Sequence, residues 1–582
     1  MTTRAVAAAR GDAPFDLLLT GATLIDVATG ELRAADVGIT GDRIASVHPR
    51  GARLDAAQVL DLAGRFLAPG FIDSHMHVES SLVTPAEYAA AVLPAGTTTI
   101  LWDPHELGNV CGIPGVAWAR DASRGLPLRV LLMAPSCVPS APGLEVAGAQ
   151  FDAPEIADLL SWPEMTGLAE VMDMAGVISG EPRMASILAA AAASGKRING
   201  HARGLSGPDL QAFCAAGITS DHEITSGEDL LAKLRAGLTV ELRGSHDGVL
   251  PGAVAALSTL PSVPPTLVLC TDDVLPDDLL AKGGMRDTLA RVIARGLPPV
   301  AAIRCATLHA ALRLGRTDIG LIAPGRIADI AVLSDLQAVS VEGCIASGRI
   351  VAWDGAMRVA LPAGADGLRG TMKLAPLRPD AFRLRVKGIA DGEAVLPVVL
   401  GTRFTALGSV RVAVRASIAE LPDGLSLLAV IHRHGRAGPA PSVGLVEGWG
   451  EIRGAIATSL AHDSHNLLVF GRDPEDMAAA ANAVIAAGGG MAVASSGAVT
   501  ALLPLPIAGL LSAAPLAETA TALARVRAAA AEVVDWLPPH RVFRGLTGAS
   551  LACNPGPRVT DRGIADGATR VLLDPALPIA AE

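Results

Sequence analysis

Apolar segments of strand length alternate with amphipathic helical segments over the central part of the chain. The apolar segments are 66–77, 97–103, 129–135, 166–172, 197–202, 217–222, 238–243 and 266–273. Helical periodicity is found at 84–94, 183–195, 206–216, 227–236 and 285–296. Eight strand–helix units in succession predict an α/β fold built on a (β/α)8 TIM-like barrel.

Short strand patterns bounded by Gly and Asp lie on both sides of this region. We expect them to pair into one small β domain, with a loose tail over residues 1–13. The predicted boundaries are 1–64 and 313–360 for the small β domain, 65–312 for the barrel, 361–380 for a linker and 381–582 for a C-terminal α/β domain. Strands of the last domain are expected near 383–387, 394–399, 410–415, 425–433, 466–470 and 491–495.

Composition narrows the classes of function. The 582 residues suit two or three domains, and half of them are hydrophobic. With a net charge of -11 and no basic run interleaved with aromatics, we expect neither nucleic-acid nor membrane binding. None of the 7 cysteines form Cys-x-x-Cys, and we see no signal peptide or 18-residue apolar run. A cytoplasmic protein in a reducing compartment is therefore expected.

Polar residues follow the C-terminal ends of the predicted strands, where a barrel of this type carries its active site. His75 and His77 lie one residue apart at the end of the first strand, so their side chains point to the same face. The other candidates are Asp103, His105, Glu106, Glu170, His201, His222, Asp272 and Asp273. One buried histidine is commonly structural, but this many polar residues at one end of a barrel indicate a metal site.

The chemistry of this set fits two metal ions that share a bridging ligand. The proposed ligands are His75, His77 and Asp272 for one ion, His201 and His222 for the other, and Glu170 as the bridge. Mixed imidazole and carboxylate ligands accept manganese, iron or zinc. We expect two divalent ions per chain, manganese or iron ahead of zinc.

These residues resemble the ligand set of the amidohydrolase superfamily, and the chain more closely resembles the bacterial adenine deaminase family. The most specific motifs are Asp103-Pro-His-Glu106 and His462-Asp-Ser-His-Asn466. Further similarity lies in 69–81, 95–99, 167–172, 199–201, 270–273, 306–310, 323–329, 433–436, 453–456 and 503–509. The resemblance runs from about residue 15 to the end and implies a C-terminal domain of the adenine deaminase type.

The resemblance implies an enzyme of purine salvage that hydrolyses adenine to hypoxanthine and ammonia. In that reaction a metal-bound hydroxide attacks C6 of the purine. Asp272 is expected to act as the general base and to deliver the proton to the departing amine. Either Glu79 or Glu106 is expected to protonate N1, and the sequence leaves both open.

Three residues after the second strand have two interpretations. Asp103, His105 and Glu106 either hold an additional metal ion or orient His75 and His77 through hydrogen bonds. Spacing alone does not decide between them.

The expected substrate-binding residues are more dispersed. His462, Asp463 and His465 either reach over the barrel mouth or form a turn with internal hydrogen bonds. Asp273 and Arg243 complete this set.

One departure from the family pattern lies around the seventh strand. The family shows a Leu-Arg-Glu-Gly-Ser-Ala-like run where this chain has Glu241-Leu-Arg-Gly-Ser-His-Asp247. His246 and Asp247 are therefore expected to alter the pocket, so the reaction class is better defined than the nucleobase.

Alternative functions remain open at this point. One alternative is a cyclic amide hydrolase or a deaminase of another nucleobase. Glu170 disfavours cyclic amide hydrolases of the dihydroorotase and hydantoinase kind, because those enzymes commonly use a carboxylated lysine at this position. Another is a catalytically inactive barrel that acts as a binding protein. The missing Cys-x-x-Cys, His-Glu-x-x-His and phosphate-loop motifs exclude cytidine-type deaminases, zincin proteases and P-loop enzymes. The apolar C-terminal region predicts a homo-oligomer, a dimer or larger.

Overall fold

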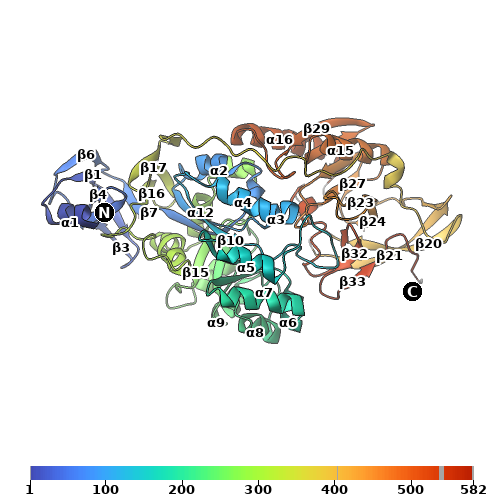
Figure 1. Cartoon of the computed structure of the whole chain (residues 1–582), viewed down its shortest axis with the longest axis horizontal. Helices are drawn as coiled ribbons and strands as arrows, with labels where there is room; N and C mark the ends of the chain where they lie inside the picture. Colours follow the sequence, from blue (N-terminus) through green and yellow to red (C-terminus); the bar gives the residue numbers. More distant parts are fainter. Residues whose placement is uncertain (1, 403, 536–542, 580–582) are drawn as a thin grey trace.

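Three parts of the chain lie in a row in the computed structural model, which describes residues 2–402, 404–535 and 543–579 (Figure 1). A small β domain lies at the N-terminal end, an α/β barrel in the middle and a larger α/β domain at the C-terminal end. The predicted fold class is confirmed.

The small β domain draws its strands from both sides of the barrel. They are β1 (Phe15–Thr20), β2 (Thr23–Asp26), β3 (Glu31–Ala34), β4 (Asp36–Thr40), β5 (Arg43–His48), β6 (Ala56–Asp61), β7 (Phe66–Pro69), β16 (Ile330–Asp335), β17 (Ser340–Ala346), β18 (Arg349–Trp353) and β19 (Ala356–Met357). They form one sheet in the order β5-β4-β1-β6 and another in the order β19-β18-β17-β16-β7-β2-β3. Pairing of β7 with β16, with Leu67 opposite Val332, joins the two flanking segments.

The expectation of a loose N-terminal tail is wrong. Residues Thr2–Arg10 form helix α1, which packs on β4 and β5. Ala8 is fully buried in a cluster with Phe15 and Leu18, so tertiary contacts stabilise a helix too short to be stable alone.

Eight parallel strands form the barrel wall. They are β8 (Phe71–Met76), β9 (Thr97–Trp102), β10 (Arg129–Ala134), β11 (Met165–Val171), β12 (Arg197–Gly200), β13 (Ser220–Asp221), β14 (Thr239–Arg243) and β15 (Leu267–Cys270). The ladders run β12-β11-β10-β9-β8 and β13-β14-β15. A parallel bridge between Met76 and Asp272 joins the first and last strands, so each predicted segment contributes one barrel strand.

The first predicted strand, 66–77, is divided between two sheets. Residues up to Pro69 form β7 of the small domain, and β8 of the barrel begins at Phe71. At Gly70 a Cβ atom would lie 2.2 Å from Thr98 Oγ1, so a side chain would clash where the chain crosses between the sheets. Both halves are apolar because both are buried, which is why the pattern is continuous.

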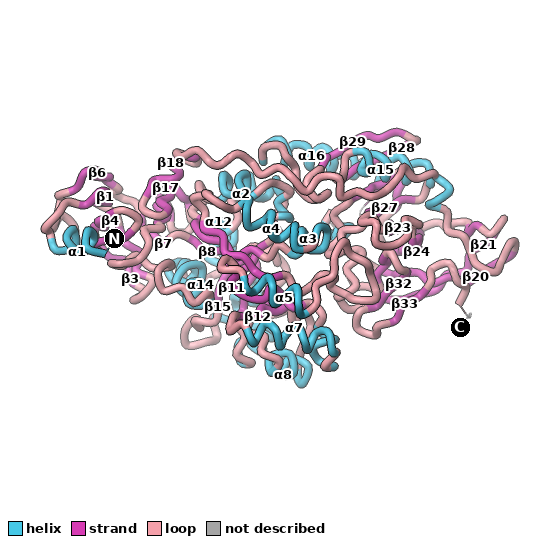
Figure 2. Tube along the Cα trace, viewed as in Figure 1, coloured by secondary structure: helices cyan, strands magenta, loops and turns pink. Residues whose placement is uncertain are grey.

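Helices cover the outside of the barrel (Figure 2). They are α2 (Pro85–Val92), α3 (His105–Cys111), α4 (Ile113–Ala122), α5 (Ala153–Ser161), α6 (Met174–Ser179), α7 (Pro182–Ala193), α8 (Gly207–Ala215), α9 (Gly227–Arg235), α10 (Leu250–Leu257), α11 (Pro276–Lys282), α12 (Met285–Ala294), α13 (Pro299–Arg304) and α14 (Ala310–Arg313), with shorter turns at Glu79–Ser81 and Cys305–His309. None of the helices in the described ranges combines the length and apolarity that a membrane span requires.

A nine-stranded sheet organises the C-terminal domain. Its strands are β20 (Gly392–Leu400), β21 (Ala406–Arg415), β22 (Ile418–Ala419), β23 (Leu425–Ile431), β24 (Ser442–Glu447), β26 (Ala455–Thr458), β27 (Leu467–Gly471), β28 (Gly490–Ser495) and β29 (Ala498–Pro504), in the order β22-β21-β20-β24-β23-β27-β26-β28-β29. The remaining elements are α15 (Pro474–Ala486), α16 (Leu516–Val533), α17 (Arg544–Thr547), the turn Pro379–Phe382, the β25 (Glu451–Ile452) and β30 (Val534–Asp535) pair, and the β31 (Arg558–Thr560), β32 (Gly563–Asp566) and β33 (Val571–Leu573) sheet.

The predicted strand at 383–387 is wrong, because this segment makes only an isolated bridge between Arg385 and Ile418. The other five strands predicted for this domain are found within one to two residues of their expected positions or inside longer strands.

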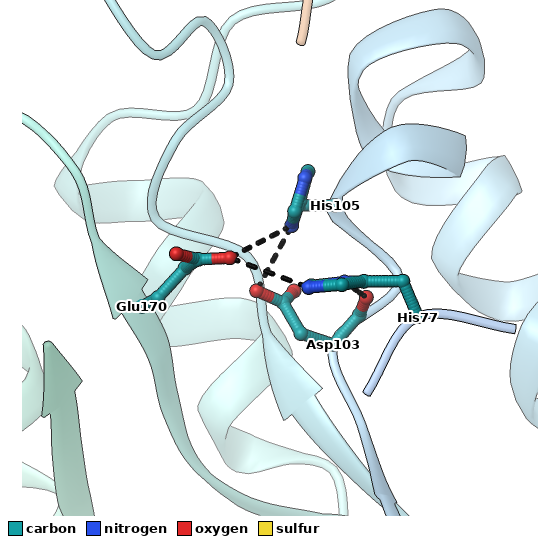
Figure 3. A group of neighbouring side chains, drawn as sticks. All are labelled: His77, Asp103, His105 and Glu170. Atoms are coloured by element: carbon teal, nitrogen blue, oxygen red, sulfur yellow. Dashed lines mark hydrogen bonds and ion pairs between the residues drawn. The ribbon is translucent and has the colours of Figure 1, made fainter. Parts of the chain in front are cut away.

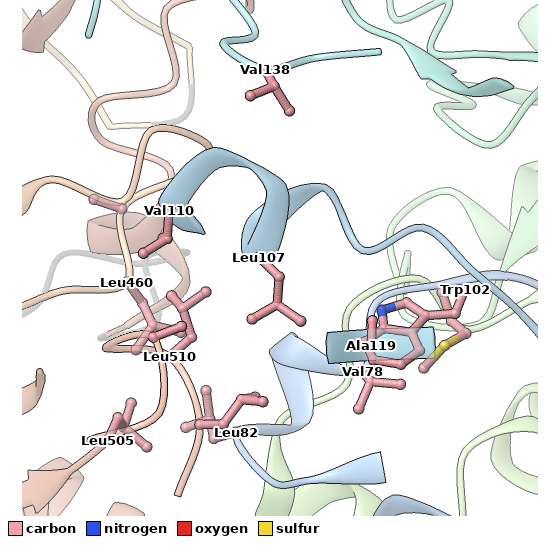
Figure 4. Packing of buried hydrophobic residues seen from close by; sticks show 14 of the residues in the cluster. Val78, Leu82, Trp102, Leu107, Val110, Ala119, Val138, Leu460, Leu505 and Leu510 are labelled. Atoms are coloured by element: carbon pink, nitrogen blue, oxygen red, sulfur yellow. The ribbon is translucent and has the colours of Figure 1, made fainter. Parts of the chain in front are cut away.

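A shared apolar core fixes the C-terminal domain against the barrel mouth. In Figure 4, Leu82 and Leu107 of the barrel lie close to Leu460, Leu505 and Leu510 of the C-terminal domain. All five side chains are buried to 98% or more, which makes this contact resemble a domain interior. The C-terminal ends of the barrel strands therefore face another domain instead of open solvent.

Candidate active site

The Glu170 carboxylate, at the end of β11, lies at the centre of the barrel mouth. Its Oε1 atom is 3.5 Å from His77 Nε2, 3.8 Å from His75 Nε2 and 3.7 Å from His105 Nδ1. Figure 3 shows His77, Asp103 and His105 converging on Glu170 from neighbouring segments.

The second carboxylate oxygen of Glu170 faces the other side of the barrel. Glu170 Oε2 is 2.8 Å from His201 Nδ1 and 3.4 Å from His222 Nε2. These histidines follow β12 and β13, the next two strands around the barrel. Two oxygens that face two sets of imidazoles would suit a carboxylate shared between two metal ions.

Asp272 completes the cluster from the end of β15. Its Oδ1 lies 3.1 Å from His77 Nε2 and 3.5 Å from His75 Nε2, and its Oδ2 pairs with Arg243. Burial alone would raise the pKa of Asp272, but the Arg243 guanidinium and the two histidines hold that pKa well below its usual range. The carboxylate is therefore ionised at neutral pH.

The donor atoms of this cluster fit bound metal. His75 Nε2, which faces Glu170 and Asp272, is a buried nitrogen without a hydrogen-bond partner among the described residues. His201 and His222 each face Glu170 with one ring nitrogen and leave the other, also buried, without such a partner. Buried polar atoms are rarely left unpaired, and imidazole nitrogens are common metal ligands. All six proposed ligands fall into groups whose ligand atoms lie within 4.8 Å of one another.

The ligand groups differ from the expected assignment, which placed His75 and His77 on the same ion. His75 groups with His222 and Asp272, whereas His77 groups with Glu170 and the residues that follow β9. The His75 and His222 rings stack with centroids 4.0 Å apart.

Asp103 and His105 lie beside the cluster and have contacts that suit both proposed roles. His77 Nδ1 lies 3.0 Å from the Asp103 carbonyl oxygen, a contact that turns His77 Nε2 toward Glu170. His105 Nδ1 lies 3.1 Å from Asp103 Oδ2, and both side chains share a ligand group with His77.

The two glutamates considered as proton donors differ in their surroundings. Trp102 Nε1 donates to Glu79 Oε2 at 2.7 Å, and the Leu107 backbone N–H donates to Glu79 Oε1 at 3.3 Å. Ser80 Oγ lies 3.3 Å from Glu106 Oε1, whereas Glu106 Oε2 accepts no hydrogen bond in the described part of the chain. Burial raises the pKa of Glu106 and raises that of Glu79 to about 7.

The C-terminal domain contributes histidines directly to this site. His462 Nδ1 lies 3.8 Å from Glu106 Oε1, and His465 Nε2 lies 3.6 Å from Glu106 Oε2. The segment is also a turn, because the His465 N–H donates to the Ala461 carbonyl at 2.8 Å. The two interpretations of residues 462–466 are therefore compatible.

Sequence patterns missed a charged network that holds Asp272. Arg243 pairs with both Asp272 and Glu223, and Glu223 also pairs with Arg203. Asp273 lies 3.9 Å from Arg243. Glu223 directly follows the proposed ligand His222, and this adjacency was the only sequence signal for it.

Asp247, one of the two unusual residues after β14, does not join the buried cluster. Asp247 pairs with Arg291 of α12, and its side chain is 56% exposed. Arg243, the residue that the family pattern shares, instead reaches the site.

Glu170→Gln is expected to lower the divalent metal content of the purified protein, because the neutral amide removes an anionic bridging ligand. Metal content is measured by plasma mass spectrometry after dialysis. Glu241→Gln is the control, since Glu241 is also fully buried but pairs with Arg313 at 3.4 Å. Equal metal content in the two variants would contradict the proposed bridge.

Comparison with known proteins identifies the family. The Amidohydrolase family model matches residues 66–351, and the Adenine deaminase C-terminal domain model matches residues 402–570. Adenine deaminase 2 of Rhizobium meliloti is 59% identical over 572 residues, which cover 98% of this chain and 96% of that protein. An adenine deaminase of Klebsiella pneumoniae is 55% identical over 576 residues, with 99% and 96% coverage. The resemblance inferred from the motifs is confirmed: the chain belongs to the adenine deaminase family of amidohydrolases.

Proposed function

We propose that this chain hydrolyses adenine to hypoxanthine and ammonia. The observation that carries the proposal is its similarity, over almost the entire length, to proteins named adenine deaminase. The buried cluster of imidazoles and carboxylates at the barrel mouth supplies groups suited to this reaction. A role in purine salvage follows from the substrate and product.

We propose two divalent metal ions per chain, manganese or iron ahead of zinc. The proposed ligands are His75, His77, Glu170, His201, His222 and Asp272. When bound, the ions activate a water molecule for attack on the purine ring.

Asp272 is the proposed general base. It takes a proton from the attacking water as the new C–O bond forms at C6, and it delivers this proton to the amine as the C–N bond breaks. The Arg243 contact fixes Oδ2, so Oδ1 is the atom that faces the histidines and the reacting groups.

Glu106 is the better proton donor to N1. Both oxygens of Glu79 already accept hydrogen bonds, whereas Glu106 Oε2 has no such partner within the described ranges. Burial raises the pKa of Glu106, which favours the protonated form that can donate. Glu79 instead serves to hold the start of α3, where Glu106 lies.

The remaining proposed substrate-binding residues divide into two groups. His462 and His465 flank Glu106 and orient its carboxyl group toward the ring. Asp273 Oδ1 accepts from Ser80 at 2.5 Å and borders the site, while Arg243 acts on substrate through Asp272. Asp463 contacts His105 instead of Glu106.

The test of the function is ammonia release from adenine by the metal-loaded protein. Guanine, cytosine and hydantoin serve as parallel substrates, and chelator-treated protein is the metal-free control. We expect release from adenine only, and loss of that release after chelation. Release from hydantoin without release from adenine would favour a cyclic amide hydrolase.

Asp272→Asn is expected to lower kcat by about 10²–10⁴-fold, because the amide cannot accept the proton from water. Asp273→Asn is the matched control, as it changes the adjacent carboxylate, which is 41% exposed. Its kcat should change much less. Near wild-type kcat in Asp272→Asn would assign the base to another residue.

Glu106→Gln should lower kcat by about 10²–10⁴-fold, because the amide has no acidic proton to give to N1. Glu79→Gln should have a smaller effect, which measures the support that Glu79 gives to α3. Steady-state deamination rates for the two purified variants make the comparison. A larger loss in Glu79→Gln would reverse the two roles.

A further inference from the structure

A second group of metal-binding side chains lies where the barrel meets the C-terminal domain. His105, Cys137 and Asp463 each offer a ligand atom within 4.8 Å of the others. They come from the start of α3, the loop after β10 and the loop before β27. All three are at least 97% buried. None of them belongs to the six ligands proposed above.

The hydrogen bonds of His105 leave one ring nitrogen available. Its Nδ1 lies 3.1 Å from Asp103 Oδ2, and when Nδ1 donates to this carboxylate the neutral ring presents a lone pair at Nε2. Metal-bound histidines commonly donate their other N–H to a carboxylate in this way. His105 Nε2 has no hydrogen-bond partner within the described ranges, and neither does Asp463 Oδ2.

The spacing suits a shared ion better than a direct hydrogen bond. His105 Nε2 lies 3.6 Å from Asp463 Oδ1, which is too long for an N–H···O hydrogen bond. Ligands bound tetrahedrally at about 2.0–2.3 Å from zinc lie about 3.3–3.8 Å from one another. The observed separation falls within this interval.

The Asn109 side chain fixes the backbone around His105 and Cys137. Asn109 Nδ2 donates to the His105 carbonyl at 3.0 Å and to the Cys137 carbonyl at 2.9 Å. One buried amide therefore ties together two of the three segments. His462 Nδ1 lies 3.3 Å from Asp463 Oδ1, so His462 borders the group.

We propose that His105 Nε2, the Cys137 thiolate and the Asp463 carboxylate bind a third metal ion that joins the barrel to the C-terminal domain. Thiolate with imidazole and carboxylate favours zinc over manganese. On binding, the Cys137 thiol loses its proton to solvent and an S–metal bond forms. The ion holds the loop that carries His462 and His465 against Glu106.

The experiment uses full-length protein stripped with a chelator and reloaded with cobalt. A thiolate bound to Co²⁺ gives a near-ultraviolet charge-transfer band, and the six ligands of the other centre include no sulfur. We expect the band in wild type and in Cys344→Ser, in which an equally buried thiol of the small β domain is replaced. Cys137→Ser should lose the band and one equivalent of bound metal.

Asp463→Asn provides a second variant in which the thiol is retained. It should also lose one equivalent of metal, as counted by plasma mass spectrometry. The proposal is overturned if wild type shows no band, if Cys137→Ser retains it, or if both cluster variants keep the wild-type metal content. These readouts do not depend on turnover, so they are separate from the test of adenine deamination.

Discussion

The burial of the Glu170 carboxylate between two sets of imidazoles is the constraint on which the rest of the site depends. A carboxylate removed from water is strongly destabilising unless charged or hydrogen-bonding partners surround it. Its partners come from the ends of β8, β12 and β13 and from the start of α3, so the ends of these strands and the start of this helix must lie at one level. The Met76–Asp272 bridge sets that level by closing the barrel between its first and last strands.

A second set of buried charges, formed by Asp272, Arg243 and Glu223, lies next to the Glu170 cluster. Asp272 faces the histidines with one oxygen and Arg243 with the other, and Arg243 in turn contacts Glu223. The guanidinium therefore balances two buried carboxylates at once, which keeps Asp272 ionised. This balance explains why an arginine on β14 contacts the cluster although it lies outside the proposed ligand set.

The C-terminal domain covers the barrel mouth and buries it in the protein interior. Its apolar contact with Leu82 and Leu107 brings the loop of residues 462–466 over the site, where His462 and His465 approach Glu106. Excluding bulk water strengthens each electrostatic interaction beneath the loop. The domain thus places two histidines around a carboxyl group that the barrel supplies.

Periodicity and spacing were enough to locate the eight barrel strands and the histidines and carboxylates at their ends, because both features depend on local chain geometry. The same reasoning missed the crossing between sheets at Gly70 and the helix at Thr2–Arg10, since long-range burial decides both. The different environments of Glu79 and Glu106, and the approach of Cys137 to Asp463, appear only in three dimensions. Those features arise from contacts between residues far apart in the chain, for which local pattern contains no signal.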